Sequence, residues 1–416
     1  MLKKVVVAVL VLMTLFSTSA LAAVTDRDIQ LQGGVLVSNA TDSFFFCPME
    51  EGMTRHWGLY ALNGGDVNLL LEVTDGVPAR LIHADDKYVY FLGYYDADRT
   101  VHTLYAVEIQ TRTVEELLTN IASAFVEDDD VFLFVPKDDL YMLSRYKLST
   151  RKQTDIKSMK KSEKTIYDAH VFKGTLYFTT KDANDTEDGY RYNDGTGLAN
   201  NLDKPTPALA SGVLYEGYRL YNDTSGRLYS VKLGNKNGSQ LGGTKYNVNL
   251  TSPRFGEALY AYDGDNHNLV RLPLDGSNEK ALHLDGNVLN RLILGGYKDE
   301  LLLYNDGAIW ALAPNLSSQE RLFDFDTASG GLMWTHIVHA AGNAIAVFGY
   351  NADTASNVTN MPPTGVFFFD RNTKTQIFGY PEYDPDNPVE YEVTMPDFFG
   401  DVPVEEKEEG ETYFVF

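Results

Sequence analysis

Short apolar runs, each ending on an aromatic residue, recur along the chain at nearly regular intervals. The spacings between successive end residues are 45, 43, 44, 43, 41, 42 and 44 residues. A regular repeat of this length is typical of folds that stack one supersecondary unit many times. The eight end residues are Phe46, Phe91, Phe134, Phe178, Tyr221, Tyr262, Tyr304 and Phe348.

A second strand is predicted after each of these runs. Its pattern is apolar, aromatic, any residue, apolar, as in residues 59–62 (Leu-Tyr-Ala-Leu) and 104–107 (Leu-Tyr-Ala-Val); Ser144 and Gly189 interrupt it in the third and fourth copies. Turn residues follow, as in 63–66 (Asn-Gly-Gly-Asp), because glycine, asparagine and aspartate supply the positive φ angles of tight hairpins. A short outer strand and an apolar segment before the aromatic run complete the unit. Each repeat therefore predicts four antiparallel strands.

The repeats are expected to stack in a ring. A four-stranded sheet with two apolar faces cannot bury both alone, whereas radial stacking buries each face against a neighbour. We therefore predict an all-β fold, a β-propeller of eight four-stranded antiparallel blades over residues 23–380, with the eight aromatic residues as core between blades. Seven blades is the alternative, because ring closure often splits one blade between the two ends of the chain. Residues 28–31 (Asp-Ile-Gln-Leu) supply a candidate strand for such a closure.

The recurring Leu-Tyr-x-Leu and aromatic strands resemble those of bacterial secreted β-propeller domains of unknown function. That family is similar to the six-bladed propeller of the low-density-lipoprotein receptor. The resemblance covers residues 31–380, with eight copies where the family commonly has six. It implies a propeller fold, and it implies nothing about activity.

The first 22 residues have the three parts of a secretory signal peptide. Lys3 and Lys4 precede an uncharged apolar run over 5–16, and small residues end at Ala22, after which cleavage is expected. The run is shorter than the ~20 residues that span a bilayer, so we expect no transmembrane segment after cleavage. A single cysteine, Cys47, allows no intrachain disulfide. The mature protein is therefore expected to be a secreted or extracytoplasmic protein of a bacterial envelope.

Residues 381–416 differ in composition from the repeats. They contain five prolines and twelve acidic residues but one lysine, which is typical of a solvated tail. The whole chain has a formal net charge of -23, which argues against nucleic acid and anionic membranes as partners. We expect a monomer whose partner is a protein or a cell-envelope glycan.

Two groups of residues are candidate metal ligands. We call the eight aromatic end residues of the repeats the marker aromatics. His83 and His170 precede the marker aromatic of their repeat by eight residues, and His339 precedes its own by nine. All three are therefore expected near the ends of innermost strands, where imidazoles can ligate zinc. The alternative is a polar ring bonded to a neighbouring carbonyl. Calcium is the possible cofactor of an oxygen-rich segment, although the segment lacks the twelfth-position glutamate of an EF-hand loop and also fits a solvated hairpin tip. Its candidate ligands are Asp182, Asn184, Asp185 and Asp188.

Three segments are candidate binding surfaces. Met53 and Trp57 lie in a rather apolar link after Phe46, which is typical either of an exposed contact patch or of a cap folded over the channel. Tyr350 begins the longest insert between two predicted strands. Lys160 and Lys161 belong to a basic stretch over 145–164, which either meets an acidic partner or forms a solvated strand edge.

The sequence contains no nucleophile elbow, no His-Glu-x-x-His and no phosphate-binding glycine loop. The pattern favours a non-catalytic binding or scaffold propeller that recognises a protein or glycan. The alternative is a propeller enzyme that acts on a carbohydrate or a lactone, with its site at the channel mouth.

Overall fold

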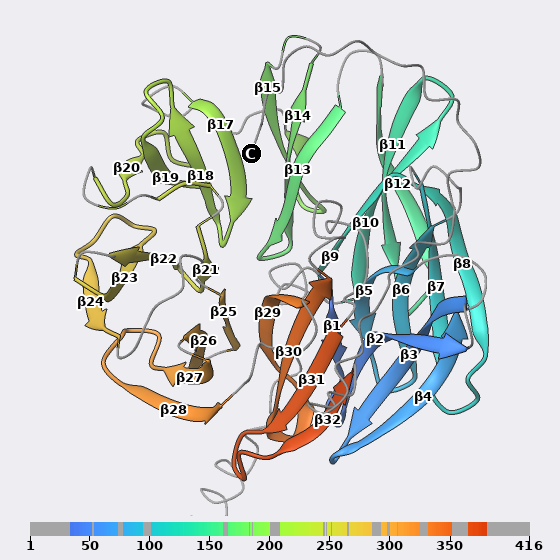
Figure 1. Ribbon diagram of the computed structural model, residues 1–416. Coiled ribbons are helices and arrows are strands. Elements are labelled where there is room, and N and C mark those ends of the chain that lie inside the picture. Colours follow the sequence, from blue (N-terminus) through green and yellow to red (C-terminus); the bar gives the residue numbers. More distant parts are fainter. Residues whose placement is uncertain are drawn as a thin grey trace, which may run out of the picture.

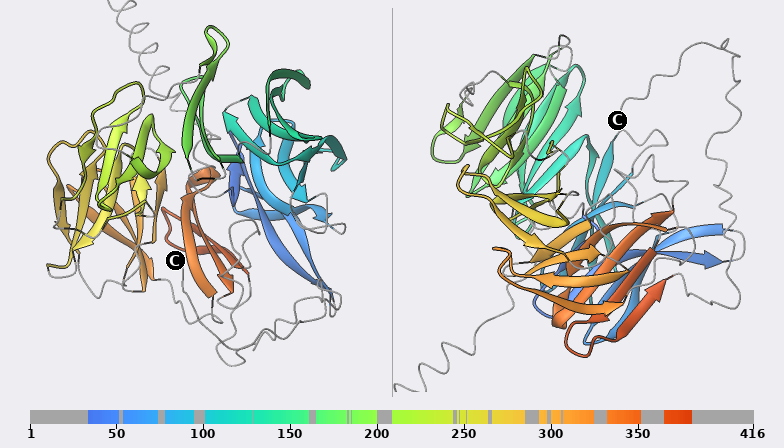
Figure 2. Two further views of the ribbon diagram at one scale, coloured as in Figure 1. Left: turned by 90° about the horizontal axis from the view of Figure 1, so that it is seen from above. Right: turned by 60° about the vertical axis from the view of Figure 1, so that its left-hand side comes forward.

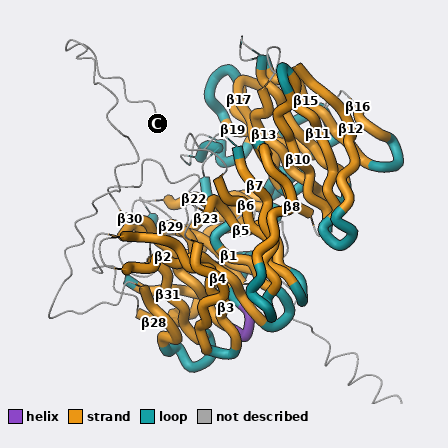
Figure 3. Tube along the Cα trace, turned by 90° about the vertical axis from the view of Figure 1, so that its right-hand side faces the viewer, coloured by secondary structure: helices purple, strands orange, loops and turns teal. Residues whose placement is uncertain are grey.

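The computed structural model describes a chain built almost entirely of β-strands. Strands dominate every part of the described chain in Figure 3. One 3-10 helix, η1 (Ala341–Asn343), is present among these residues. The described residues are 34–51, 54–73, 78–94, 101–127, 129–160, 165–182, 184, 186–199, 209–243, 246, 248–250, 252–263, 266–284, 293–297, 300–305, 307–324, 332–351 and 365–380.

The strands form eight sheets of four antiparallel strands each, and the sheets follow one another in chain order around a ring (Figure 1). Views from above and from the side show the same order (Figure 2). The structure is thus the eight-bladed β-propeller that the repeat predicts, rather than the seven-bladed alternative. Each sheet uses four consecutive strands, so no described strand is exchanged between the two ends of the chain. Residues 28–31, the predicted signal peptide and the predicted acidic tail lie outside the described residues.

The first four blades have the following strands. Blade 1 contains β1 (Leu36–Ser38), β2 (Asp42–Glu51), β3 (Thr54–Asn63) and β4 (Asp66–Val73). Blade 2 contains β5 (Pro78–Ala84), β6 (Tyr88–Tyr94), β7 (His102–Glu108) and β8 (Val114–Ile121). Blade 3 contains β9 (Ser123–Glu127), β10 (Asp130–Lys137), β11 (Leu140–Lys147) and β12 (Lys152–Lys160). Blade 4 contains β13 (Thr165–Phe172), β14 (Thr175–Lys181), β15 (Glu187–Asn193) and β16 (Gly197–Ala199).

The second four blades repeat this plan. Blade 5 contains β17 (Leu209–Tyr215), β18 (Tyr218–Asp223), β19 (Leu228–Lys232) and β20 (Ser239–Gln240). Blade 6 contains β21 (Arg254–Phe255), β22 (Ala258–Asp263), β23 (Asn268–Pro273) and β24 (Lys280–His283). Blade 7 contains β25 (Ile293–Tyr297), β26 (Glu300–Asn305), β27 (Ala308–Leu312) and β28 (Gln319–Asp324). Blade 8 contains β29 (Leu332–His339), β30 (Ala344–Asn351), β31 (Gly365–Asp370) and β32 (Gln376–Tyr380).

Local chemistry explains the tight turns. The turn between β3 and β4 contains Gly64 and Gly65 with φ of +56° and +106°, and it joins the opposed residues Asn63 and Asp66. Two consecutive positive φ angles match the right-handed twist of the strands that flank a two-residue hairpin loop. A residue with a Cβ atom would be strained at both positions. The predicted hairpin turn is therefore confirmed.

The core lies between the blades, where the eight marker aromatics were predicted. Seven of them are at most 4% exposed, and Tyr262 is partly buried with its hydroxyl 3.0 Å from Nδ1 of His267. Among the described residues, seven of the eight blade junctions contain a cluster of buried apolar side chains from both blades. At the junction of blades 4 and 5, the described cluster of Tyr221, Tyr229 and Val231 belongs to blade 5 alone.

Side chains rather than a shared strand close the ring between blade 8 and blade 1. The rings of Phe45 and Phe368 are 4.7 Å apart between centroids, inside a cluster that draws on both blades. The amide of Ala341 also donates a hydrogen bond of 2.7 Å to Oγ of Ser43. Among the described residues, apolar packing and this hydrogen bond hold the two ends of the propeller together.

No helix in the described part of the chain is long and apolar enough to cross a membrane.

Candidate functional site

The innermost strands of blades 4, 5 and 6 bring three polar side chains together. Asp168 in β13 accepts a hydrogen bond of 2.5 Å from the amide of Leu214 in β17. Arg254 in β21 lies over the ring of Tyr215 in β17, with 5.2 Å between the guanidinium carbon and the ring centroid. Arg254 also interacts electrostatically with Asp168. An acid, a phenol and a guanidinium from three successive blades thus form one group at the inner side of the ring.

A β-bulge places Asp168 on the face that meets blade 5. The pairing of β13 with β14 shifts between Ile166 and Asp168, so that Ile166 lies opposite Thr180 and Asp168 lies opposite Thr179. A bulge re-aims a side chain in this way at the rims of barrels and beside functional sites. Here the bulge directs the carboxylate of Asp168 toward the backbone of the neighbouring blade.

The environment makes Asp168 a carboxyl group that titrates near neutral pH. Burial raises the pKa of Asp168 to about 6, against the lowering effect of the amides of Leu214 and Ala169 and of the Arg254 charge. Burial also lowers the pKa of Arg254, which Tyr215 and Asp168 partly offset. A buried carboxyl group beside a specific cationic partner is typical of functional sites. This group can accept a ligand hydrogen bond or exchange a proton.

We expect Asp168→Asn to flatten the pH dependence of stability between about pH 4 and pH 6. Because folding raises the pKa of Asp168 from 3.8 to about 6, the folded protein holds this proton more tightly than the unfolded chain. The free energy of unfolding therefore falls as pH rises through this window, by at most about 3 kcal/mol for about two pKa units.

Urea unfolding of the wild type and of Asp168→Asn at pH 4 and pH 7 measures this difference. Asp139→Asn is the control, since Asp139 is exposed in the turn between β10 and β11. Identical pH dependence of the wild type and of Asp168→Asn would contradict the buried environment of Asp168.

The structure does not gather the three predicted histidine ligands. The ring of His83 lies 5.8 Å from that of Tyr90, and the ring of His170 lies 6.1 Å from that of Phe172. Nε2 of His339 is 3.0 Å from Oε2 of Glu300. Among the described residues, which include all three histidines, no three His, Cys, Asp or Glu side chains are grouped so as to hold a metal ion.

His339 belongs to a charged network that joins blade 7 to blade 8. Although burial acts to raise the pKa of Glu300, the adjacent imidazole of His339 and the hydrogen bonds from Arg371 hold it at about 2. Arg371 also reaches Glu320, with 3.1 Å between Nη2 and Oε2, and Nζ of Lys374 lies 3.2 Å from Oε1 of the same residue. This histidine therefore pairs with an acid across a blade junction.

The predicted calcium ligands lie in the hairpin that connects β14 with β15. Oδ1 of Asp182 accepts hydrogen bonds from the amides of Asn184 (2.8 Å) and Thr186 (2.9 Å), so this carboxylate stabilises the turn. Asp188 lies in β15 opposite Thr180, and Asp185 lies outside the described residues. Calcium binding by these residues stays a prediction.

The predicted surface residues have different environments. Trp57 is 6% exposed and packs between blades 1 and 2, because β2 and β3 continue as one ladder that pairs Trp57 with Pro48. It is a core residue and does not form an exposed contact patch. Lys160 is exposed at the end of β12, whereas Met53 and Lys161 lie outside the described residues. The backbone of Tyr350 lies in β30, and the structure does not describe its side chain.

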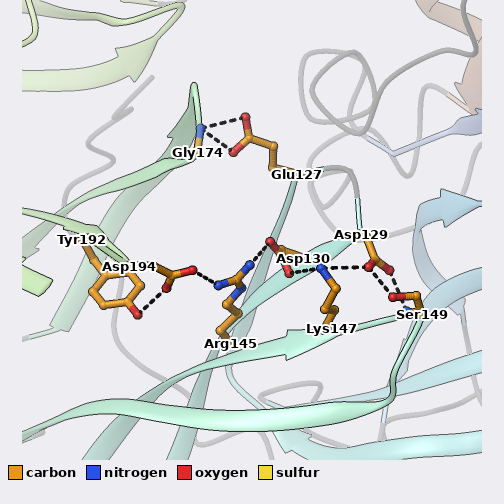
Figure 4. Close-up of polar contacts among 9 residues, drawn as sticks. All are labelled: Glu127, Asp129, Asp130, Arg145, Lys147, Ser149, Gly174, Tyr192 and Asp194. Atoms are coloured by element: carbon orange, nitrogen blue, oxygen red, sulfur yellow. Dashed lines mark hydrogen bonds and ion pairs between the residues drawn. The ribbon is translucent and has the colours of Figure 1, made fainter. Parts of the chain in front are cut away.

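Part of the predicted basic stretch is neutralised within the ring. Arg145 pairs with Asp130 of its own blade and with Asp194 of blade 4, and Nζ of Lys147 lies 3.3 Å from Asp129 (Figure 4). Arg151 pairs with Glu115 of blade 2. The two arginines link blade 3 to its neighbours and Lys147 pairs within blade 3, so the exposed lysines of β12 are the part of the stretch that faces solvent.

Asp168 and Arg254 are the site residues that sequence reasoning missed. The available signal was a charged residue inside an innermost strand, as in 166–171 (Ile-Tyr-Asp-Ala-His-Val). Ion pairs and strand-end charges produce the same signal, so it does not single out a site without the contacts between blades.

No protein-family model matches the sequence, and no curated protein matches it. Solved structures do match it. A chain from a structural analysis of two prolyl endopeptidases aligns over 79% of this chain and 55% of its own, at 12% identity and a TM-score of 0.49. The β-propeller domain of the Trilobed protease from Pyrococcus furiosus aligns over 85% of this chain and 95% of its own, at 10% identity and a TM-score of 0.40. An oligogalacturonate lyase in complex with manganese aligns over 80% and 83%, at 12% identity and a TM-score of 0.38.

Proposed function

We propose that the protein is an extracytoplasmic recognition module that binds a cell-envelope glycan or a protein partner through the inner side of its ring. The observation that carries this proposal is the group of Asp168, Tyr215 and Arg254 on three successive innermost strands. Ligand sites typically use a few precisely placed polar groups on a rigid scaffold to fix the orientation of the ligand. A propeller fold alone does not imply a function, so this group of residues is what supports the proposal.

A hydroxyl-rich ligand suits this group best. An ionised carboxylate only accepts hydrogen bonds and a guanidinium only donates them, so Asp168 and Arg254 together match a ligand whose hydroxyls do both. Bonds to charged groups contribute about 1.5 to 3 kcal/mol each. The predicted signal peptide and the resemblance to bacterial secreted propellers favour an envelope glycan over an intracellular ligand.

We expect the Asp168→Asn variant to bind its glycan about 10- to 100-fold more weakly than the wild type, since one charge-assisted hydrogen bond is replaced. The ligand is to be found by titrating the mature protein with soluble peptidoglycan fragments and envelope polysaccharides, using calorimetry. Arg254→Met should lower the affinity for the same ligand, whereas Asp139→Asn should bind it with the affinity of the wild type. Equal affinity of Asp168→Asn and the wild type would contradict this site.

The second candidate function is an enzyme that acts on a carbohydrate or a lactone. The observation that favours it is the pKa of Asp168 at about 6, since a group near the working pH transfers protons efficiently in either direction. The same glycans, incubated with the protein and analysed for products, separate the two functions. Turnover that disappears in Asp168→Asn would establish the enzyme, and binding without products would support the recognition module.

A further inference from the structure

The junction between blades 4 and 5 differs in chemistry from the other seven. Those seven contain mixed apolar clusters among the described residues, including the junction of blades 8 and 1 where the ends of the propeller meet. The innermost strands of the two blades, β13 and β17, contact each other at the exceptional junction. The cluster of buried apolar residues described there comes from blade 5 alone, while the ring of Phe172 in blade 4 lies against Gly217 of blade 5.

A buried ion pair occupies this junction. Glu187 of blade 4 pairs with Arg219 of blade 5, and their side chains are 4% and 6% exposed. Taking two charges out of water costs several kcal/mol per ion, and their attraction offsets this cost only when the remaining donors and acceptors are also satisfied. Within the described part of the chain, Oε2 of Glu187 and Nε of Arg219 have no hydrogen-bond partner. This pair therefore holds the two blades together less firmly than apolar packing of the same area does.

Two neutral polar side chains add to the desolvation cost at this junction. Among the described residues, the hydroxyls of Thr179 in blade 4 and Tyr221 in blade 5 have no hydrogen-bond partner, although the two residues are 1% and 0% exposed. The hydroxyl of Thr180, on the opposite face of blade 4, has none either, so the ion pair is what distinguishes the junction with blade 5. Thr179 lies opposite Asp168, on the face toward blade 5, while Phe178 packs against blade 3. An unsatisfied buried polar group costs about 1 to 3 kcal/mol, which is recovered when water reaches it.

We propose that the ring opens at the junction between blades 4 and 5, so that solvent and polar ligands reach Asp168 and Arg254 from this side. Separation there exposes the buried ion pair and polar hydroxyls, which gain hydration, together with the apolar cluster of blade 5. Separation at another junction exposes apolar side chains of both blades, which costs about 25 cal/mol per Å². The opening joint therefore lies in the middle of the chain, between two halves of four blades, and not where the ends of the propeller meet. This inference goes beyond the proposed function and holds for any ligand.

Cysteine labelling without ligand tests the opening. Thr179 and Thr180 are adjacent in β14, both are 1% exposed, and they lie on opposite faces of blade 4. Thr180 lies opposite Ile166, which packs in the apolar cluster between blades 3 and 4. Thr179→Cys thus reports on the polar junction, and Thr180→Cys reports on the apolar one in the same blade.

We expect a maleimide to label Thr179→Cys at least ten-fold faster than Thr180→Cys under native conditions, since unfolding of the blade would expose both. The native Cys47 is 1% exposed and burial raises its pKa, so its background labelling should be slow; it is measured in the wild type. Equal rates, or faster labelling of Thr180→Cys, would overturn the proposal.

A second pair of variants guards against a folding defect in the first. Tyr221→Cys replaces the marker aromatic that faces the polar junction, and Phe178→Cys replaces the fully buried marker that faces blade 3. Both changes create a cavity of similar size, so the expected faster labelling of Tyr221→Cys reflects the junction. Since no ligand is present, failure of this test is distinct from failure of the glycan-binding test.

Discussion

Replacing Glu187 by alanine should lower the free energy of unfolding by about 3 to 5 kcal/mol, because it leaves the Arg219 charge buried without its partner. The Arg219 side chain is 6% exposed between two blades and cannot move fully into water without separating them. Arg219→Ala should cost a similar amount, since Glu187 is then the unpaired buried charge. Urea denaturation at pH 7 measures both effects.

Two further variants distinguish a buried pair from an ordinary one. Replacing both partners, as Glu187→Leu with Arg219→Met, should recover most of the loss, because apolar residues of similar volume avoid the desolvation cost. Asp324→Ala breaks an exposed ion pair, in which the side chain of Arg321 is 48% exposed and that of Asp324 is 82% exposed. It should cost less than about 1 kcal/mol. A small effect of Glu187→Ala, equal to that of Asp324→Ala, would show that the pair is solvated.

Replacing Phe368 by alanine should destabilise the ring by about 3 to 5 kcal/mol, the usual cost of removing a buried phenylalanine from a packed core. Phe368 is fully buried at the junction of blades 8 and 1. Its ring lies 4.7 Å from Phe45, 6.2 Å from Phe348 and 6.4 Å from Phe378. Because no described strand crosses this junction, such side chains carry the closure.

Phe378→Ala is the matched control for ring closure. Phe378 is a partly buried phenylalanine in the outer strand β32 and contacts the same cluster. Its replacement should cost about half as much, since less apolar surface returns to water. The urea midpoints of both variants give the comparison. Equal midpoints for Phe368→Ala and the wild type would mean that something other than this cluster closes the ring.

The repeat was sufficient to predict the fold because each copy contains its own strand pattern and its own turn residues. The marker aromatics mark one sheet each, from Phe46 in blade 1 to Phe348 in blade 8, which is why eight copies correspond to eight blades. Glycines such as Gly64 and Gly65 mark hairpin turns that only need neighbouring residues to form. These signals depend on residues a few positions apart, so a single sequence contains them in full.

The candidate site depends on contacts between copies and was not predictable in the same way. The histidine spacing correctly placed His83, His170 and His339 near the ends of innermost strands, but it does not specify which face of a strand each ring occupies. Bulges change that face, as the one before Asp168 does. The raised pKa of Asp168 arises from burial between blades, which no pattern within one repeat records.

The environment of Trp57 was missed for a related reason. The sequence predicts a rather apolar link over residues 47–58, whereas β2 and β3 pair over their full length. Strand alternation then places Trp57 on the same face as Leu59 and Ala61, against blade 2. A long hairpin with mixed composition has no sequence signal as strong as the aromatic repeat.

Hydrogen exchange of two backbone amides in the unmodified protein tests the central claim most directly. The amide of Leu214 donates to Asp168 across the polar junction, and the amide of Leu81 donates to the carbonyl of Gly34 across the apolar junction of blades 1 and 2, at 3.0 Å. Both are leucine amides in innermost strands. If the ring opens between blades 4 and 5, Leu214 should exchange at least ten-fold faster than Leu81. Equal protection of the two amides, or faster exchange of Leu81, would contradict the account.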